Sequence, residues 1–292
     1  PPLFDNIFAA IEKWMRELLT GMVESNMSTM FTDVNEKTSE IAAQVGRTPQ
    51  NWNSSVFSMI QNLSESVVVP IAGIIITLVL CYELISMLTE RNNLHDVDTW
   101  MFFKYFVKAW VAIYLVSNTF TITMAVFDVG QSVVNSASGI INGETAIDVS
   151  SLSMQMQAAM ATMEIGELVV LALETFLVSF CMKIMSVVIT VIVYGRMIEI
   201  YLYTSLAPIP FATMSNREWG HVGTNYFRGL FALAFQAFLM MVCVAIYAAL
   251  ISSVRISSNM HSALIGVAAY TVILCFSLMK TGSLSKQIFG SH

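Results

Sequence analysis

Charged residues are scarce in this chain of 292 residues: they make up 12% of it, whereas hydrophobic residues make up 56%. Soluble domains average about 25% charged residues, so the composition excludes an ordinary soluble protein. No basic tract offers a footprint for nucleic acid. The four cysteines lie inside apolar runs, without the spacing of a disulfide framework or a zinc site. The four histidines are scattered, and no glycine-rich phosphate loop follows a strand. The sequence therefore predicts no catalytic site, no metal site and no cofactor.

Long apolar runs dominate the rest of the chain. A helix needs about 20 mainly apolar residues to cross the hydrocarbon core of a bilayer. Five segments meet or approach this length, and they predict a polytopic, all-α membrane protein. The predicted spans are 66–88, 104–130, 168–192, 225–252 and 263–281.

The first 65 residues differ from the rest. Residues 3–23, "LFDNIFAAIEKWMRELLTGMV", place apolar side chains three and four apart and charged ones on the opposite face. Their charge argues against a span and favours a helix at the interface or on a partner. A second, weaker amphipathic helix follows. We therefore expect an amphipathic helical region over 1–65 and a membrane domain over 66–292.

Basic residues orient the predicted spans, because loops rich in Lys and Arg stay in the cytoplasm. The loop 89–108 carries Arg91, Lys104 and Lys108, whereas the connection 127–167 carries no Lys or Arg. The loop is therefore predicted to be cytoplasmic, and the connection and residues 1–65 to lie outside.

The apolar region 167–214 is too long for one straight crossing, because a helix of this length would measure roughly 72 Å. Two crossings would place most of the basic residues that follow it outside, whereas one net crossing places most of them inside. We therefore expect one span over 168–192, and a re-entrant or interfacial helix over 197–214 that stays on the cytoplasmic side. Five spans then place the N-terminus outside and the C-terminus in the cytoplasm of a bacterial plasma membrane.

Ionisable residues within the predicted spans are candidates for a functional site, because a charge at the bilayer centre costs about 3 kcal/mol on insertion scales. Lys183 lies near the middle of 168–192. It is a candidate pore or interface residue, or it pairs with a buried carboxylate such as Glu83 or Glu174, or its long side chain snorkels to the membrane surface. We favour the pairing. Glu174 lies less deep and is a weaker candidate in its own right.

The re-entrant segment contributes a second candidate group. Arg196 and Glu199 are three residues apart and share a helix face, so they either form a local ion pair or hold this segment against its neighbours. Pro208 and Pro210 break the helix, and the backbone groups they free must be buried in protein or face water.

The segment that follows the prolines, "NREWG", predicts a cytoplasmic loop with an interfacial aromatic anchor. Its candidate contacts with a partner are Arg217, Glu218 and Trp219. A partner ATPase is one candidate for this contact.

Several segments together resemble a known family. The stretch 194–243 joins an apolar helix, an arginine, an Ala-Pro motif, a short polar loop and another apolar helix. With "VNEKTSEIAAQVGRTPQNWN", "LCYELISMLTERNNLHDVDTWMFFK" and "KTGSLSKQIF", it resembles the TrbL/VirB-type polytopic membrane component of conjugative type IV secretion systems. The resemblance is to the branch on integrative conjugative elements of Gram-positive bacteria.

The resemblance implies a non-enzymatic membrane subunit that forms a homo-oligomeric ring and helps to pass a DNA–protein substrate. Partner ATPases and other secretion subunits would act with it. Two alternatives stay open: a secondary transporter, and a scaffold that does not conduct. Transporters often contain inverted repeats with paired broken helices, and five spans with one break do not divide in that way.

Overall fold

The computed structural model describes residues 2–89, 99–141, 149–254 and 260–291, and within these ranges the chain is helical and contains no strand. The prediction of an all-α polytopic membrane protein is confirmed. The elements are α1 (Pro2–Val45), α2 (Pro49–Trp52), α3 (Ser54–Leu63), the π-helical turn η1 (Ser64–Val68), α4 (Val69–Thr89), α5 (Thr99–Ser117), α6 (Thr119–Ile141), α7 (Val149–Met160), α8 (Ile165–Ser205), α9 (Pro208–Thr213), α10 (Gly220–Ser252) and α11 (Met260–Ile288).

Five helical stretches in the described part of the chain are long and apolar enough to cross a membrane. They are Ser54–Thr89, Thr99–Ser117, Ile165–Ser205, Gly220–Ser252 and Met260–Ile288. Each predicted span overlaps one of these stretches. Four of the stretches extend beyond the predicted limits at one or both ends, whereas Thr99–Ser117 ends well before residue 130.

The chain divides into two compact units, and several long helices contribute to both. The first unit comprises Pro1–Val45, Ala137–Val193 and Met240–Met279. The second comprises Gly46–Ser136, Tyr194–Leu239 and Lys280–His292.

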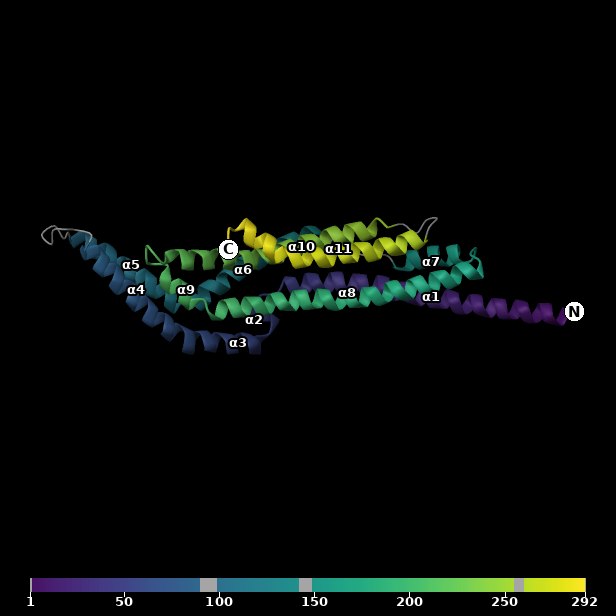
Figure 1. The fold of residues 1–292 in the computed structure, drawn as a ribbon, viewed down its shortest axis with the longest axis horizontal. Helices are drawn as coiled ribbons and strands as arrows, with labels where there is room; N and C mark the ends of the chain where they lie inside the picture. Colours follow the sequence, from purple (N-terminus) through teal and green to yellow (C-terminus); the bar gives the residue numbers. More distant parts are fainter. Residues whose placement is uncertain (1, 90–98, 142–148, 255–259, 292) are drawn as a thin grey trace. The chain divides into compact units, whose positions relative to one another are not determined.

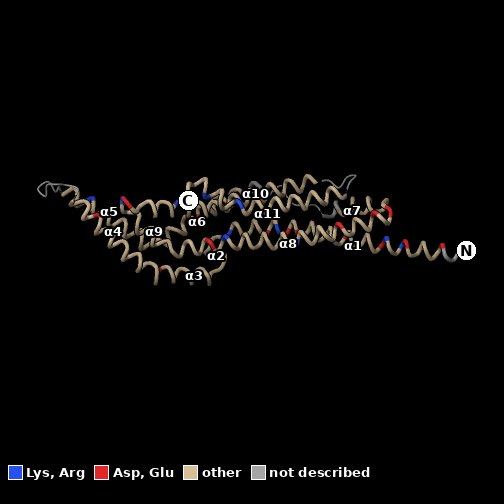
Figure 2. Tube along the Cα trace, viewed as in Figure 1, with Lys and Arg blue, Asp and Glu red and all other residues tan. Residues whose placement is uncertain are grey.

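In the first unit, α1 is one continuous helix rather than the two predicted from the sequence. Its second half buries a stripe of apolar side chains at helical spacing, from Val23 and Met27 to Ile41 and Val45. Its first half carries both acidic and basic residues (Figure 2) and leaves large apolar side chains such as Phe8 and Trp14 exposed. The two halves of α1 therefore differ in burial, although they form a single helix.

Hydrogen bonds connect α1 to α7, to α8 and to the turn between them within the first unit. Arg16 donates to the main-chain oxygen of Met163 at 2.8 Å, and Gln157 of α7 donates to Glu24 at 2.7 Å. Further along, Lys37 donates to Thr190 of α8 at 3.2 Å. These contacts follow α1 from its middle toward its C-terminal end.

In the second unit, the short helix α9 packs against α4 and α5 (Figure 1). Phe211 and Ala212 of α9 are buried with small and β-branched side chains of the two longer helices. The partners are Ala72 and Ile76 of α4, and Ala112 and Val116 of α5. Small residues at these positions allow the helices to approach closely.

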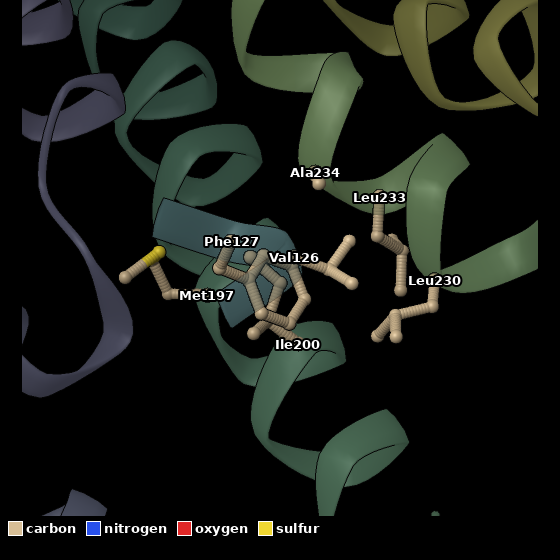
Figure 3. Close-up of a cluster of buried hydrophobic side chains, with 7 residues drawn as sticks. All are labelled: Val126, Phe127, Met197, Ile200, Leu230, Leu233 and Ala234. Carbon is tan, nitrogen blue, oxygen red and sulfur yellow. The ribbon is translucent and has the colours of Figure 1, made fainter. Parts of the chain in front are cut away.

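A second apolar core in the same unit joins α6, α8 and α10. Figure 3 shows its side chains, which converge from the three helices. The cluster comprises Val126, Phe127, Met197, Ile200, Leu230, Leu233 and Ala234. In α8 the cluster involves Met197 and Ile200, which follow Arg196 directly.

The predicted second span, 104–130, runs through two helices, because α5 ends at Ser117 and α6 begins at Thr119. At the junction, Asn118 donates from its side chain to the main-chain oxygen of Tyr114 at 2.9 Å. The hydroxyl of Thr119 bonds two main-chain oxygens of the preceding turn. Such side chains compete with the helical ladder and bend it.

The predicted boundary between a span ending at 192 and a separate helix over 197–214 is absent from the structure. Instead, α8 continues to Ser205, and α9 begins at Pro208. Proline has no N–H to bond the preceding turn, and its fixed φ suits the first position of a helix. Pro208 and Pro210 therefore lie in the first turn of α9, directly after the break that the missing N–H of Pro208 produces.

Candidate membrane-embedded polar site

Arg196 is the most buried charged residue among the candidates, with 7% of its surface exposed. It projects from α8, and its Nη2 donates to the main-chain oxygen of Leu233 in α10 at 3.3 Å. Within the described residues, its Nε has no hydrogen-bond partner. The guanidinium thus links α8 to α10, and no carboxylate of the described residues contacts it.

Glu199, one turn further along α8, reaches a different helix. Its carboxylate forms an ion pair with Lys286 of α11 at 3.0 Å, and both side chains are about half-exposed. No ion pair between Arg196 and Glu199 occurs in the part of the chain that the structure describes. The sequence left open whether Arg196 and Glu199 pair with each other or hold this segment against its neighbours. In the structure both side chains contact neighbouring helices.

The helices α10 and α11 contribute polar residues that the sequence analysis did not select. Gln236 donates to Thr281 at 3.4 Å, and the hydroxyl of Ser285 donates to the main-chain oxygen of Ala232 at 2.6 Å. All three side chains are buried. Gln236 stands alone in the apolar stretch "FALAFQAFL", and that isolation is the signal that would have identified it.

The loop after α9 is folded against α4. Both carboxylate oxygens of Glu218 accept from the hydroxyl of Tyr82 at 3.0 Å, and Trp219 stacks on the Tyr82 ring with centroids 5.7 Å apart. Asn216 accepts from the main-chain N–H groups of residues 218 and 219 and so closes the turn. Arg217 is exposed beside them. Two of the three predicted partner-loop residues are thus engaged within the chain.

Lys183 has an exposed side chain on α8 and forms no ion pair or hydrogen bond within the described residues. The two carboxylates predicted as its partners are engaged elsewhere. Glu83 forms an ion pair with Lys108 of α5, and Glu174 contacts His261 of α11. The favoured pairing of Lys183 is therefore not found in this part of the chain. The contact between Glu174 and His261 was missed because the two residues are far apart in sequence.

No group of three or more metal-ligating side chains occurs among the described residues, and the four cysteines are free. The polar residues of α8, α10 and α11 hold helices together. They form no arrangement of nucleophile and base in the described part of the chain.

Comparison with known proteins assigns the chain to a family. A family model described as "TrbL/VirB6 plasmid conjugal transfer like protein" matches residues 34–208, which is more than half of the chain. The match covers the end of α1 and the whole of α2 to α8, including Lys183, Arg196 and Glu199, and ends at Pro208. No curated protein and no solved structure matches the chain. With its helices long enough to span a membrane, the chain belongs to the TrbL/VirB6 conjugal transfer family and is a multi-pass membrane component of a conjugal transfer system.

Proposed function

We propose that this protein forms a homo-oligomeric ring in the bacterial plasma membrane, at the base of a conjugative type IV secretion apparatus. The ring contributes to the passage of a DNA–protein substrate, and partner ATPases supply the energy. Residues 1–65 lie outside and the C-terminal end lies in the cytoplasm, as the distribution of basic residues favours.

Lys183 is the observation that carries this proposal. Its neighbours on the exposed face of α8 are large apolar side chains, including Phe176, Phe180 and Val187. Such a face suits neither lipid tails, which exclude an unpaired ammonium, nor bulk water, which disfavours a continuous apolar surface. A subunit interface or a passage bounded by other subunits accommodates both kinds of side chain.

Oligomer formation is tested on the purified full chain by mass photometry in mild detergent or nanodiscs. We expect a defined homo-oligomer, because the exposed face of α8 and the apolar face of the first half of α1 are available for burial between copies. A stable monomer under both conditions would contradict the proposal.

The role of Lys183 is tested with Lys183→Met and a control, Val187→Met, on the same face. Because no carboxylate pairs with Lys183 in the described residues, we expect Lys183→Met to keep the stability of the wild type or to raise it. Conjugal transfer should nevertheless fall, while Val187→Met should transfer normally. If Lys183→Met transfers DNA normally, Lys183 no longer supports the proposal that α8 lines a passage or a subunit interface.

A scaffold that does not conduct is the second candidate, because it is consistent with the same helices and the same family. A photo-crosslinking residue at position 183 distinguishes the two. Crosslinks to transferred DNA or its attached protein support a conduit, whereas crosslinks only to other secretion subunits support the scaffold.

A further inference from the structure

Residues 5–14 of α1 form a stretch of helix in which every side chain is exposed. In Figure 1 this end of α1 extends past α7. A helix this short is marginal in water by itself, because most helical stability in proteins comes from the packing of an apolar face. The apolar face of this segment therefore needs a covering surface that its own chain does not supply among the described residues.

Four large apolar side chains on this segment lie in one line, at alternating spacings of four and three residues. They are Ile7, Ile11, Trp14 and Leu18, which we call the N-terminal seam, and about half or more of each is exposed. This alternation is the pattern of the a and d positions in a coiled coil, where helices pack seam to seam. The spacing therefore suits packing against another helix.

A lipid surface is the other candidate to cover this face, and the charges beside the N-terminal seam disfavour it. Helices that lie on membranes usually carry Lys and Arg on their polar face, because the lipid surface attracts cations. Residues 5–18 carry three acidic residues and two basic ones. One of the two basic residues, Arg16, already donates to the main-chain oxygen of Met163. The charge of the segment therefore favours a protein surface over anionic lipid.

A ring of identical membrane subunits fixes how these segments meet. Every copy has the same orientation in the membrane, and the copies of a closed ring are related by rotation. The first halves of α1 are therefore parallel, and equal residues lie at equal height. The membrane domains also hold the segments close together, which raises their effective concentration and allows so short a seam to pack.

The charges on the two flanks of the N-terminal seam fit a parallel arrangement. At about 100° per residue, Glu12 lies roughly 130° to one side of the centre of the seam, and Lys13 lies roughly 130° to the other side. Parallel helices bring opposite flanks together, so Glu12 of one copy faces Lys13 of the next. Antiparallel helices would bring like flanks together, and Glu12 would then face Glu12.

The contact that Lys13 makes within its own chain does not compete strongly with this arrangement. Its ammonium lies 4.0 Å from the carboxylate of Glu17, and both side chains are largely exposed. Exposed pairs of this kind contribute little, because solvent screens them. Lys13 is therefore able to turn toward a neighbouring copy.

We propose that residues 7–18 of neighbouring copies pack as a parallel bundle of helices outside the membrane. The N-terminal seam faces the axis of the ring, and Glu12 of each copy lies beside Lys13 of the next. The partner that covers this face is a second copy of the same chain. The inference rests on the proposed ring and deepens it, because it identifies a segment through which the copies meet.

Cysteine crosslinking of the full chain tests the bundle, with the four native cysteines replaced. Ile11→Cys places a thiol in the N-terminal seam, and Lys13→Cys is the matched control on the exposed far side of the same turn. We expect a short bifunctional maleimide to link Ile11→Cys between copies and to leave Lys13→Cys largely unlinked. If neither position is linked, or both are linked equally, the bundle is wrong.

Mass photometry of the same samples separates failure of the bundle from failure of the ring. A defined homo-oligomer that shows no seam crosslinks would overturn the bundle and leave the ring in place. The first half of α1 would then be covered by lipid or by a different protein. A stable monomer would overturn the ring and the bundle together.

An exchange of charges tests the flanks of the seam. Lys13→Glu places two acidic side chains together between copies and should make amide exchange of residues 7–18 severalfold faster in the assembled protein. The double variant Glu12→Lys with Lys13→Glu restores opposite charges between copies and should restore slow exchange. Both variants lose the pair of Lys13 with Glu17, so that pair cannot explain a recovery. Equally fast exchange in both variants would contradict the packing of Glu12 beside Lys13.

Discussion

The guanidinium of Arg196 donates to the main-chain oxygen of Leu233 at 3.3 Å, whereas the carboxylate three residues later, that of Glu199, pairs with Lys286. Arg196 and Glu199 of α8 thus contact two different helices, α10 and α11. Arg196 is buried and contacts no carboxylate among the described residues, while Glu199 and Lys286 are half-exposed. These differences in burial give different expectations for their removal.

Replacing Arg196 by methionine should leave the protein at least as stable as the wild type. The buried charge has a large desolvation cost and one main-chain acceptor, and a long apolar side chain can replace its packing. We expect the free energy of unfolding to stay unchanged or to rise by up to about 2 kcal/mol in thermal unfolding of the purified protein. Arg196→Ala also removes the packing of the stem and should cost about 2 kcal/mol or more. An equal loss for both variants would show that the charge itself stabilises the fold.

The ion pair of Glu199 and Lys286 should contribute little. Both side chains are about half-exposed, so solvent screens their attraction. A double-mutant cycle with Glu199→Gln and Lys286→Gln should give a coupling energy of about 0.2–1 kcal/mol. A coupling above about 2 kcal/mol would indicate that the pair is shielded from water in the assembled protein.

Gly223 should not tolerate a side chain. A Cβ at this position would lie 2.1 Å from Cγ of Met214 and 2.5 Å from the main-chain oxygen of Pro210. Gly195 is also helical, but a Cβ there would meet nothing within 4 Å. Gly223→Ala should therefore destabilise the protein by about 1–3 kcal/mol, whereas Gly195→Ala should be neutral or stabilise it by about 0.5–1 kcal/mol. Equal effects in thermal unfolding would contradict the close approach of α10 to α9.

The contact of Tyr82 with the loop after α9 can be divided into two parts. Tyr82→Phe removes the hydrogen bond to Glu218 but keeps the ring that stacks on Trp219. We expect local opening of residues 214–219 to become easier by about 1 kcal/mol, measured by amide hydrogen exchange. Tyr82→Ala removes both contacts and should accelerate exchange further. If neither variant changes exchange, the loop is held by the turn at Asn216 alone.

The sequence determined the features that depend on local pattern. The length and apolarity of the runs predicted an all-α membrane protein, because a span requires about 20 apolar residues whatever their neighbours. The Ala-Pro motif and "NREWG", together with the other quoted segments, indicated the family. The family model matches residues 34–208, so "NREWG" at 216–220 lies beyond the matched range. The prolines predicted a break near 208, because proline has no N–H to continue a helix.

The tertiary structure decided which helices meet and where the helix breaks lie. Helical periodicity places Arg196 and Glu199 on one face, but the partners Leu233 and Lys286 depend on the packing of α10 and α11 against α8. The partners of Glu83 and Glu174 were likewise set by distant helices, leaving Lys183 without a partner in the described residues. A residue's position along its own helix is a local property, whereas its neighbours across a bundle depend on the packing of segments far apart in sequence.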